Sequence, residues 1–364
     1  MKLLRAFVVF TLGLAAALLL PACNQDDHRL SVAFISNNPH EFWTIARNGT
    51  REAAKKFDVD VEFHMPANGT AAEQHQIIED LVAKGVRGIA ISPNDPAHQS
   101  RVLNRIIPDN VGFITQDSDL PPTSKRRCYI GTDNVKAGRA VGDLVKEAVP
   151  EGGEMVIYVG MLDVQNAQER QRGVIASLAD IPDTPAGNEK AVALCRKIEY
   201  PLRVGPRGKY VILDTMTDEA SQPKCKANVE DTLAAHPKVR CLVGLWAYNP
   251  PAMLQAVQAR KLTGKVKLIG FDEDEETLEG IKKGAIYATV VQDPYKFGYE
   301  AVRILQHLER KGKLPEPEDQ TVQKVGINYF VKHRVIRRQK DVKPGQLFDE
   351  DVDRFHRDLK LKKQ

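Results

Sequence analysis

Short apolar runs recur along the chain, and most of them end at a polar or aromatic residue that precedes a helix-like segment. The runs and the residues that follow them are 32–35 with Phe42 and Trp43, 111–114 with Asp117, 155–159 with Arg170, 242–245 with Asn249, 266–271 with Asp272, and 288–291 with Gln292. In an open α/β sheet, ligands bind beyond the carboxyl ends of parallel strands, so these side chains are predicted to face one crevice. Convergent polar groups beside two aromatic rings indicate a ligand pocket more than a reaction centre.

Segments with apolar residues three and four positions apart alternate with these runs from residue 31 to about residue 310. They predict helices over 41–57, 71–84, 133–148, 166–179, 226–235, 250–260, 274–283 and 294–310. Such alternation predicts parallel sheets covered by helices on both faces. The stretch 181–209 is rich in Pro, Gly and charge, and it is predicted to be an insertion made mostly of loops.

The N-terminus carries the signals of export. Lys2 and Arg5 precede an apolar run over 6–20 that is too short for a comfortable membrane span, so residues 1–22 are predicted to be a signal peptide. A small residue before Cys23 resembles the bacterial lipobox, in which the cysteine is lipidated and becomes the new N-terminus. We therefore expect a periplasmic or cell-surface protein that is anchored to the membrane by lipid. An uncleaved membrane anchor is the alternative.

Charge and motifs exclude several classes of function. Removing residues 1–22 takes away two positive charges and leaves 50 basic against 48 acidic side chains, a near balance that does not suggest nucleic-acid binding. No GxSxG, HExxH, glycine-rich phosphate loop or metal-spaced Cys/His cluster occurs, so we expect no enzyme, cofactor or metal. A remote alternative is an exported carbohydrate-active enzyme with His40 as base and Asp117 as its orienting group.

The four cysteines after Cys23 fall into two pairs. Cys128 and Cys241 sit within or beside apolar runs and are predicted to be buried. Cys195 and Cys225 flank a predicted strand over 210–213. Export to an oxidising compartment would permit a disulfide between them, and the sequence leaves that pairing open.

The composition changes after residue 331, where eleven Lys and Arg stand against six Asp and Glu. Phe348, Val352, Phe355 and Leu359 form an apolar stripe with a period near that of a helix. We expect a helix that packs on the body of the protein, and a membrane-surface role is the alternative.

Six short segments carry a family resemblance, and they occur in the same order as in that family. They are 38–43 (NPHEFW), 92–95 (SPND), 131–134 (GTDN), 169–173 (ERQRG), 269–272 (IGFD) and 291–294 (VQDP). Together they resemble the ribose-binding-protein-like family of bacterial periplasmic sugar-binding proteins, the substrate-binding lipoproteins of ABC transporters. The resemblance covers about residues 31–335. It implies an α/β fold of two Rossmann-like lobes, each a parallel sheet flanked by helices, joined by a three-crossing hinge.

The resemblance also implies lobe boundaries. The N-terminal lobe is expected to comprise 23–131 and 293–327, and the C-terminal lobe 132–292 and 328–336. A basic tail follows over 337–364. Roughly 340 mature residues exceed what one hydrophobic core usually serves, which agrees with two lobes.

Carried over position by position, the resemblance implies a sugar site in the cleft between the lobes. Its residues are His40, Phe42, Trp43, Asp117 and Ser118 from the first lobe, Arg170, Asn249 and Asp272 from the second, and Gln292 at a crossing. Sugar hydroxyls both donate and accept hydrogen bonds, which suits carboxylates, amides and a guanidinium, and aromatic faces match the C–H faces of a sugar ring. We expect these polar groups to be solvated while the cleft is open.

Each of several site residues also has a purely structural interpretation. Asp117 could be a turn residue, Asp272 and Asn249 could be helix N-caps, Arg170 could be a solvated helix charge, and Trp43 could belong to the core.

Departures from the family bear on the ligand. Ribose-type members usually have Asn where this chain has His40 and Arg where it has Ser118, and the second-lobe aromatic expected near Ser221 is absent. Trp246 or Tyr248 is a candidate replacement. We therefore expect a small carbohydrate other than ribose, whose identity the sequence leaves open.

The implied partner is an ABC permease, to which a monomeric binding protein delivers the sugar. Signalling to a membrane receptor or kinase is the alternative. Related sugar-responsive repressors carry a DNA-binding segment where this chain has its predicted signal peptide.

Overall fold

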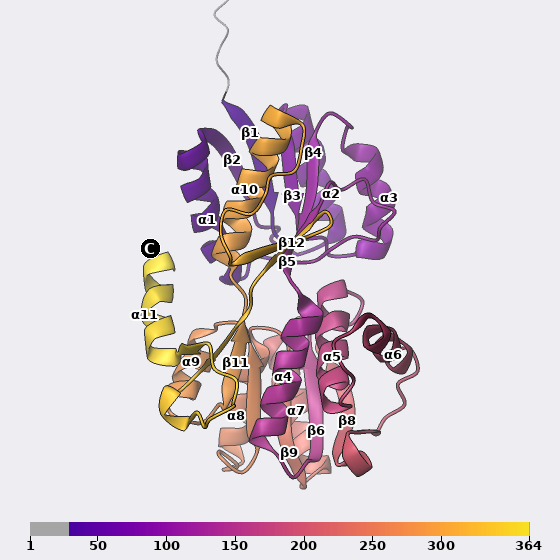
Figure 1. The fold of residues 1–364 in the computed structure, drawn as a ribbon, viewed down its shortest axis with the longest axis vertical. Coiled ribbons are helices and arrows are strands. Elements are labelled where there is room, and N and C mark those ends of the chain that lie inside the picture. The colour runs from indigo at the N-terminus through magenta and orange to yellow at the C-terminus, as the bar shows by residue number, and fades with distance from the viewer. Residues whose placement is uncertain (1–28, 364) are drawn as a thin grey trace, which may run out of the picture.

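Two sheets of mostly parallel strands organise residues 29–363, the part of the chain that the structure, a computed structural model, describes (Figure 1). The predicted signal peptide and Cys23 lie outside the described residues. Within them, no helix is both long and apolar enough to cross a membrane.

The first lobe is built on a seven-stranded sheet in the order β12-β13-β5-β4-β3-β1-β2. Its strands are β1 (Leu30–Ile35), β2 (Val59–His64), β3 (Gly88–Ile91), β4 (Gly112–Gln116), β5 (Tyr129–Thr132), β12 (Val322–Val325) and β13 (Asn328–Val331). Its helices are α1 (Phe42–Phe57), α2 (Ala71–Ala83), α3 (Pro96–Ile106) and α10 (Pro294–Lys311). Alternate residues of β1 face opposite sides, so Phe34 packs with α1 and α10 while Ile35 packs with α2 and α3.

The second lobe has an eight-stranded sheet in the order β15-β14-β11-β10-β9-β6-β8-β7. Its strands are β6 (Gly153–Val159), β7 (Leu202–Val204), β8 (Tyr210–Thr217), β9 (Val239–Gly244), β10 (Lys267–Phe271), β11 (Ala288–Val291), β14 (Arg334–Arg337) and β15 (Glu350–Asp351). Its helices are α4 (Asn134–Ala148), α5 (Gln165–Leu178), α6 (Pro185–Cys195), α7 (Gln222–Ala235), α8 (Asn249–Ala259), α9 (Glu275–Lys282) and α11 (Val352–Lys363), with 3₁₀ turns η1 (Pro206–Gly208) and η2 (Gln339–Asp341). The predicted two-lobe α/β class is confirmed.

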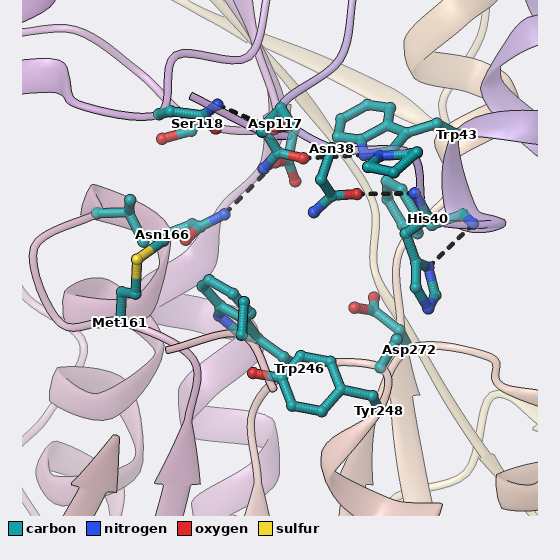
Figure 2. A pocket seen from close by; sticks show the side chains of 18 of the residues that line it. Asn38, His40, Trp43, Asp117, Ser118, Met161, Asn166, Trp246, Tyr248 and Asp272 are labelled. Atoms are coloured by element: carbon teal, nitrogen blue, oxygen red, sulfur yellow. Dashed lines mark hydrogen bonds between the residues drawn. The ribbon is translucent and has the colours of Figure 1, made fainter. Parts of the chain in front are cut away.

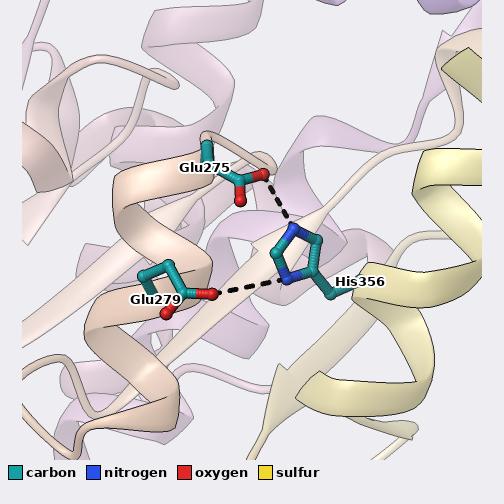
Figure 3. Close-up of side chains that lie close together, drawn as sticks. All are labelled: Glu275, Glu279 and His356. Carbon is teal, nitrogen blue, oxygen red and sulfur yellow. Dashed lines mark hydrogen bonds and ion pairs between the residues drawn. The ribbon is translucent and has the colours of Figure 1, made fainter.

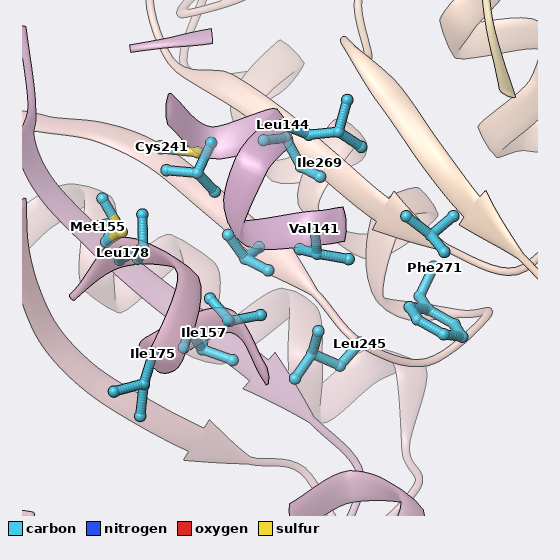
Figure 4. Close-up of a cluster of buried hydrophobic side chains, with 14 of the residues drawn as sticks. Val141, Leu144, Met155, Ile157, Ile175, Leu178, Cys241, Leu245, Ile269 and Phe271 are labelled. Atoms are coloured by element: carbon cyan, nitrogen blue, oxygen red, sulfur yellow. The ribbon is translucent and has the colours of Figure 1, made fainter. Parts of the chain in front are cut away.

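Helices cover both faces of the second sheet. Val141 and Leu144 of α4 and Ile175 of α5 pack against Ile157 and Ile269 of the central strands (Figure 4). The opposite face is covered by α7, α8 and α9. The central strands are therefore buried on both sides, as near-continuous apolar runs require.

Three segments connect the lobes (Figure 1). They join β5 to α4, β11 to α10, and β13 to β14. In the first two, Asp133 and Asp293 cap the helix that follows, each accepting a hydrogen bond at 3.1 Å from the backbone N–H of Lys136 and Lys296 respectively. These caps fix where the chain enters the next lobe.

The third crossing lies four residues later than the sequence predicted. Residues 328–331 were expected in the C-terminal lobe, but β13 pairs in parallel with β5, which places Tyr329 opposite Ile130 in the first sheet. A hairpin turn with Gly326 at φ 60 connects β12 to β13, and the Tyr329 side chain is fully buried. The crossing is therefore at residues 332–333.

The insertion over 181–209 contains more regular structure than its composition predicted. Thr184 caps α6 by accepting a hydrogen bond from the Gly187 N–H, and Pro185 occupies the first turn. Ala191 of this helix packs with Ile181 and Ala176, and β7 pairs antiparallel with β8. The loop-dominated prediction is wrong here, because cap and proline signals outweigh the polar composition.

The tail folds into α11, which packs on the body of the protein as predicted, mainly on the second lobe. Val352, Phe355 and Leu359 of the apolar stripe are buried, and Phe348 is half-buried. The His356 ring lies between Glu275 and Glu279 of α9, with 2.7 Å from Nε2 to a Glu275 carboxylate oxygen (Figure 3).

The four described cysteines are free. Cys128 and Cys241 are buried, which confirms that prediction, and the disulfide left open between Cys195 and Cys225 is not formed. Burial raises the pKa of the Cys195 thiol to about 11 and that of Cys225 to about 12.

Candidate functional site

A cavity of about 550 Å³ lies between the two lobes, where the carboxyl ends of both sets of parallel strands meet. Eight of the nine predicted ligand-binding residues line it: His40, Phe42, Trp43, Asp117, Ser118, Arg170, Asp272 and Gln292. Trp246 and Tyr248, the candidate replacements for the absent aromatic, line it as well. Open α/β sheets bind ligands at this edge, because the loops after the strands converge there.

Two aspartates occupy equivalent positions in the two lobes (Figure 2). Asp117 follows β4 with φ 59, and Asp272 follows β10 with φ 64. The backbone N–H of Asp117 donates to the Ile130 carbonyl at 3.0 Å, and that of Asp272 donates to the Val290 carbonyl at 2.8 Å. Asp tolerates this left-handed conformation better than most residues, and it turns each side chain out of the strand into the cleft.

Both carboxylates are buried, and burial raises the pKa of each. For Asp117, the Arg170 charge and a hydrogen bond from Ser92 Oγ at 3.1 Å act in the opposite direction. Burial raises the pKa of Asp272 to about 6, although Arg170 and the Gln292 amide, which donates at 2.9 Å, lower it. The cleft thus holds two strong acceptors at low hydration.

Arg170 lies between these carboxylates as part of a buried network. Its Nε donates to Asn134 Oδ1 and its Nη1 to the Leu245 carbonyl, each at 2.9 Å. The guanidinium lies 4.0 Å from the centre of the Phe271 ring, and the residue is only 2% exposed. A solvated helix charge is excluded by this burial, and the orientation of the fork is fixed on two sides.

The first-lobe aromatics serve the core and the cavity together. Trp43 packs with Phe34, its Nε1 donates to Asn37 Oδ1 at 2.9 Å, and its ring meets the edge of Phe42 with centroids 4.9 Å apart. The His40 backbone N–H donates to Asn38 Oδ1, and His40 Nδ1 accepts from the Phe42 N–H. The core and ligand interpretations of Trp43 are therefore compatible.

Several buried polar atoms around the cavity have no hydrogen-bond partner within the described protein. They are Ser118 Oγ, Asn166 Oδ1, Arg170 Nη2, Trp246 Nε1 and Gln292 Oε1. Buried polar groups of native proteins are nearly always satisfied, so such a set marks a place where a ligand or water completes the bonding. The set mixes donors and acceptors, as hydroxyl groups require.

Asn249 is a correction to the predicted site. Its Nδ2 donates to Asp218 Oδ2 at 3.0 Å, and its Oδ1 accepts from the Trp246 N–H at 2.8 Å. The residue is fully buried and does not line the cavity. Its amide is used inside the second lobe, so it shapes the cavity wall instead of facing a ligand.

Sequence reasoning missed other lining residues, notably Asn38, Asn94 and Asn166. Asn166 Nδ2 approaches Asp117 Oδ2 of the opposite lobe at 3.5 Å. Asn166 precedes Arg170 by one helical turn on α5, and that spacing was a usable signal. Asn94 follows β3, and its Nδ2 donates to the Asn37 carbonyl at 2.9 Å.

One group of side chains among the described residues has the composition of a metal site, and it lies away from the cleft. Glu275, Glu279 and His356 place their ligand atoms within 4.8 Å of one another. The Lys282 ammonium contacts both His356 Nδ1 and Glu279 Oε1. The positive charge in this group is therefore already supplied by the Lys282 side chain, and the contacts of the group link α9 to α11.

Comparison with known proteins places the chain among binding proteins. A family model described as a periplasmic binding protein domain matches residues 32–313. The ribose import binding protein of Salmonella typhimurium is 23% identical over 301 residues, which are 82% of this chain and 90% of the relative. The D-allose-binding periplasmic protein of Escherichia coli is 23% identical, covering 76% and 83% of the two chains.

Solved structures give the same result. A solute-binding protein of an ABC transporter from Burkholderia graminis, in complex with D-arabinose, is 27% identical with a TM-score of 0.72, covering 87% of this chain and 98% of that one. GanP, a glucose-galactose binding protein from Geobacillus stearothermophilus, is 26% identical with a TM-score of 0.69, covering 87% and 99%. The chain belongs to the periplasmic binding protein family and has its fold of two α/β lobes around a central cleft.

Proposed function

We propose that this protein captures one small carbohydrate in the cleft between its lobes. One observation carries the proposal. Asp117, Asp272 and Arg170 line the same cavity, Arg170 Nη2 has no hydrogen-bond partner within the described protein, and aromatic rings form part of the wall. Carboxylates accept from adjacent hydroxyls, the guanidinium donates, and ring faces cover C–H groups. The relatives named above for the binding of ribose, D-allose and D-arabinose support the same class of ligand.

The protein then delivers this sugar to the permease of an ABC importer. Residues from both lobes line the cavity, so a ligand contacts both only when the cleft is closed and shifts the population toward that state. The three connecting segments act as the hinge. The closed form presents a different surface from the open form, and a membrane partner can recognise it. The proposal includes no catalytic step.

A lipid on Cys23 holds the protein at the outer side of the cell membrane, where it works as a monomer. Radiolabelled palmitate should label the wild-type chain in a bacterial host and should not label Cys23→Ala. Recovery of permease subunits with the sugar-loaded protein would support transport. Recovery of a receptor or histidine kinase in their place would favour the sensing alternative.

The test of ligand class is a thermal-shift screen of the purified protein against mono- and disaccharides, polyols and nucleosides. A ligand at a hundred times its dissociation constant adds about 2.7 kcal/mol to the free energy of unfolding. A shift with one or a few sugars supports the proposal. No shift with any carbohydrate, or a shift only with nucleosides, contradicts it.

A further inference from the structure

Three loops of the second lobe meet at one buried carboxylate behind the cavity wall. Asp218 follows β8 and is fully buried. Its backbone N–H and that of Glu219 donate to the Gly160 carbonyl at 3.3 and 2.9 Å, which joins this loop to the loop after β6. Its side chain accepts from the Tyr248 hydroxyl on Oδ1 and from Asn249 Nδ2 on Oδ2, at 3.0 Å for the latter, which joins it to the loop after β9.

The same contacts hold the aromatic wall. Asn249 Oδ1 accepts from the Trp246 N–H, and the Asn249 N–H donates to the Trp246 carbonyl at 3.0 Å. The Trp246 and Tyr248 rings meet edge to face with centroids 6.2 Å apart (Figure 2). Trp246 also lies against Gly160 so closely that a Cβ there would come within 2.1 Å of the ring. Asp218 thus fixes Tyr248 directly and Trp246 through Asn249.

Asp218 itself does not line the cavity, whereas Trp246 and Tyr248 do. Because the Tyr248 hydroxyl is bonded to Asp218, the ring and not the hydroxyl is what a ligand meets. We propose that Asp218 is a positioning residue, which holds Trp246 and Tyr248 opposite the first-lobe aromatics and thereby sets the sugar selectivity of the cleft. This inference rests on the proposed function of sugar binding.

Physical chemistry favours a carboxylate in this role. A buried charge is costly unless several donors satisfy it, and the hydrogen bonds it then makes are about twice as strong as neutral ones. The neighbouring Glu219 and Ala220 hold left-handed backbone conformations at φ 55 and 59, which a flexible loop would relax. The loop is therefore held in place by the bonds that converge on Asp218.

The test compares Asp218→Ala, Asp218→Asn and Tyr248→Phe with Asp231→Ala, an exposed aspartate of α7, as the matched control. The chain has two tryptophans, so in a Trp43→Phe background the emission reports on Trp246 alone. D-Allose and D-arabinose binding is measured by calorimetry in the full chain. We expect Asp218→Ala to red-shift the Trp246 emission and to change the ratio of the two dissociation constants about three- to tenfold, the range of one aromatic contact.

Asp218→Asn keeps the acceptor for Tyr248 and should show a smaller change, and Tyr248→Phe should change the ratio even if Asp218→Ala does not fold. Unchanged emission and an unchanged ratio in Tyr248→Phe and in a folded Asp218 variant would overturn the positioning role, as would equal weakening of both sugars. If the wild-type protein binds neither sugar, that result counts against the proposed binding of these sugars and not against the role of Asp218. The Trp246 emission of the Asp218 variants then still shows whether Asp218 positions Trp246.

Discussion

Single residues decide the chemistry of this cleft through their surroundings. Asp117 and Asp272 have the same position after a strand and the same left-handed backbone. Asp272 accepts from the Gln292 amide at a crossing, whereas Asp117 accepts from Ser92, which follows β3 of the first lobe. Each lobe therefore contributes one carboxylate that is anchored to its own scaffold. A ligand bonded to both would link the scaffolds directly.

The burial of Asp272 predicts a pH dependence. Its pKa is raised from 3.8 to about 6, so the stabilisation from its bound proton is fully present below pH 3.8 and is lost as the pH rises through about 6. Sugar affinity should change in the opposite direction, because protonation removes an acceptor. Calorimetry between pH 5 and about pH 7 should show weaker binding at the acid end. Asp272→Asn should lose that dependence, and a wild-type profile parallel to the variant would contradict the assignment.

Arg170 behaves differently from the solvated cleft arginine that the sequence suggested. Removing its side chain leaves Asn134 Oδ1 and the Leu245 carbonyl without their donor. Arg170→Ala should therefore lower the free energy of unfolding by about 1–3 kcal/mol, besides abolishing sugar binding. Arg172→Ala, which alters a half-exposed pair with Glu169, is the control and should cost less than about 1 kcal/mol. Chemical denaturation without sugar measures both.

Residue orientation is where prediction from sequence was weakest. The order of runs and polar residues, completed by the family resemblance for His40 and Ser118, predicted eight of the nine candidates that line the cavity, because strand ends converge whatever the exact backbone path. Asn249 was misplaced because the direction of a side chain just past a strand depends on a buried partner, Asp218, from a different loop. No local pattern encodes that partner.

At the scale of elements, close helix crossings position the site. A Cβ on Gly138 of α4 would come within 2.2 Å of the Arg170 carbonyl, and one on Gly173 of α5 within 2.2 Å of the Val135 carbonyl. In the first lobe, Gly49 of α1 and Gly298 of α10 allow a similar approach. Absence of a side chain at these four positions lets the helices that border the cleft lie backbone to backbone.

Gly138→Ala should therefore displace α5 and the Arg170 fork that it carries. Overpacking of this kind costs about 1–3 kcal/mol of stability, and sugar affinity should fall as well, because the donor moves away from its ligand. Lys136→Ala, an exposed position of the same helix, supplies the comparison. Thermal unfolding and calorimetry measure the two effects. A stable Gly138→Ala protein with wild-type affinity would show that α5 is positioned by other contacts.

Periodicity predicted the longer helices within a few residues, since each has one apolar face. The lobe boundary implied by the family resemblance was wrong at β13, where the apolar residues after the hairpin turn suit either sheet. Pairing with β5 places β13 in the first lobe. That pairing depends on contacts between residues far apart in the sequence, which a short stretch of sequence does not reveal. The helix α6 was missed for a related reason, because its buried residues are few.

At the scale of the whole molecule, α11 touches both lobes. It is anchored on the second lobe by Phe355, Leu359 and the His356 contacts. Its end reaches the first lobe, where Asn48 Nδ2 of α1 donates to the Lys362 carbonyl at 2.8 Å. The family model ends at residue 313, so this bridge is built from a segment outside the matched range.

The bridge should favour the closed form, because its first-lobe contact requires the lobes to be close. Besides the Asn48 bond, the Lys362 ammonium lies 3.3 Å from a carboxylate oxygen of Asp293 at the second crossing. Losing contacts worth about 1 kcal/mol lowers the closed population roughly fivefold where that form is the minor one, and apparent sugar affinity falls by the same factor. The double variant Asn48→Ala, Lys362→Ala should show this by calorimetry, together with a larger radius of gyration by X-ray scattering without sugar. Arg357→Ala, exposed on the same helix, should leave both unchanged. Equal affinities for all three proteins would mean that α11 moves with the second lobe and leaves closure to the hinge.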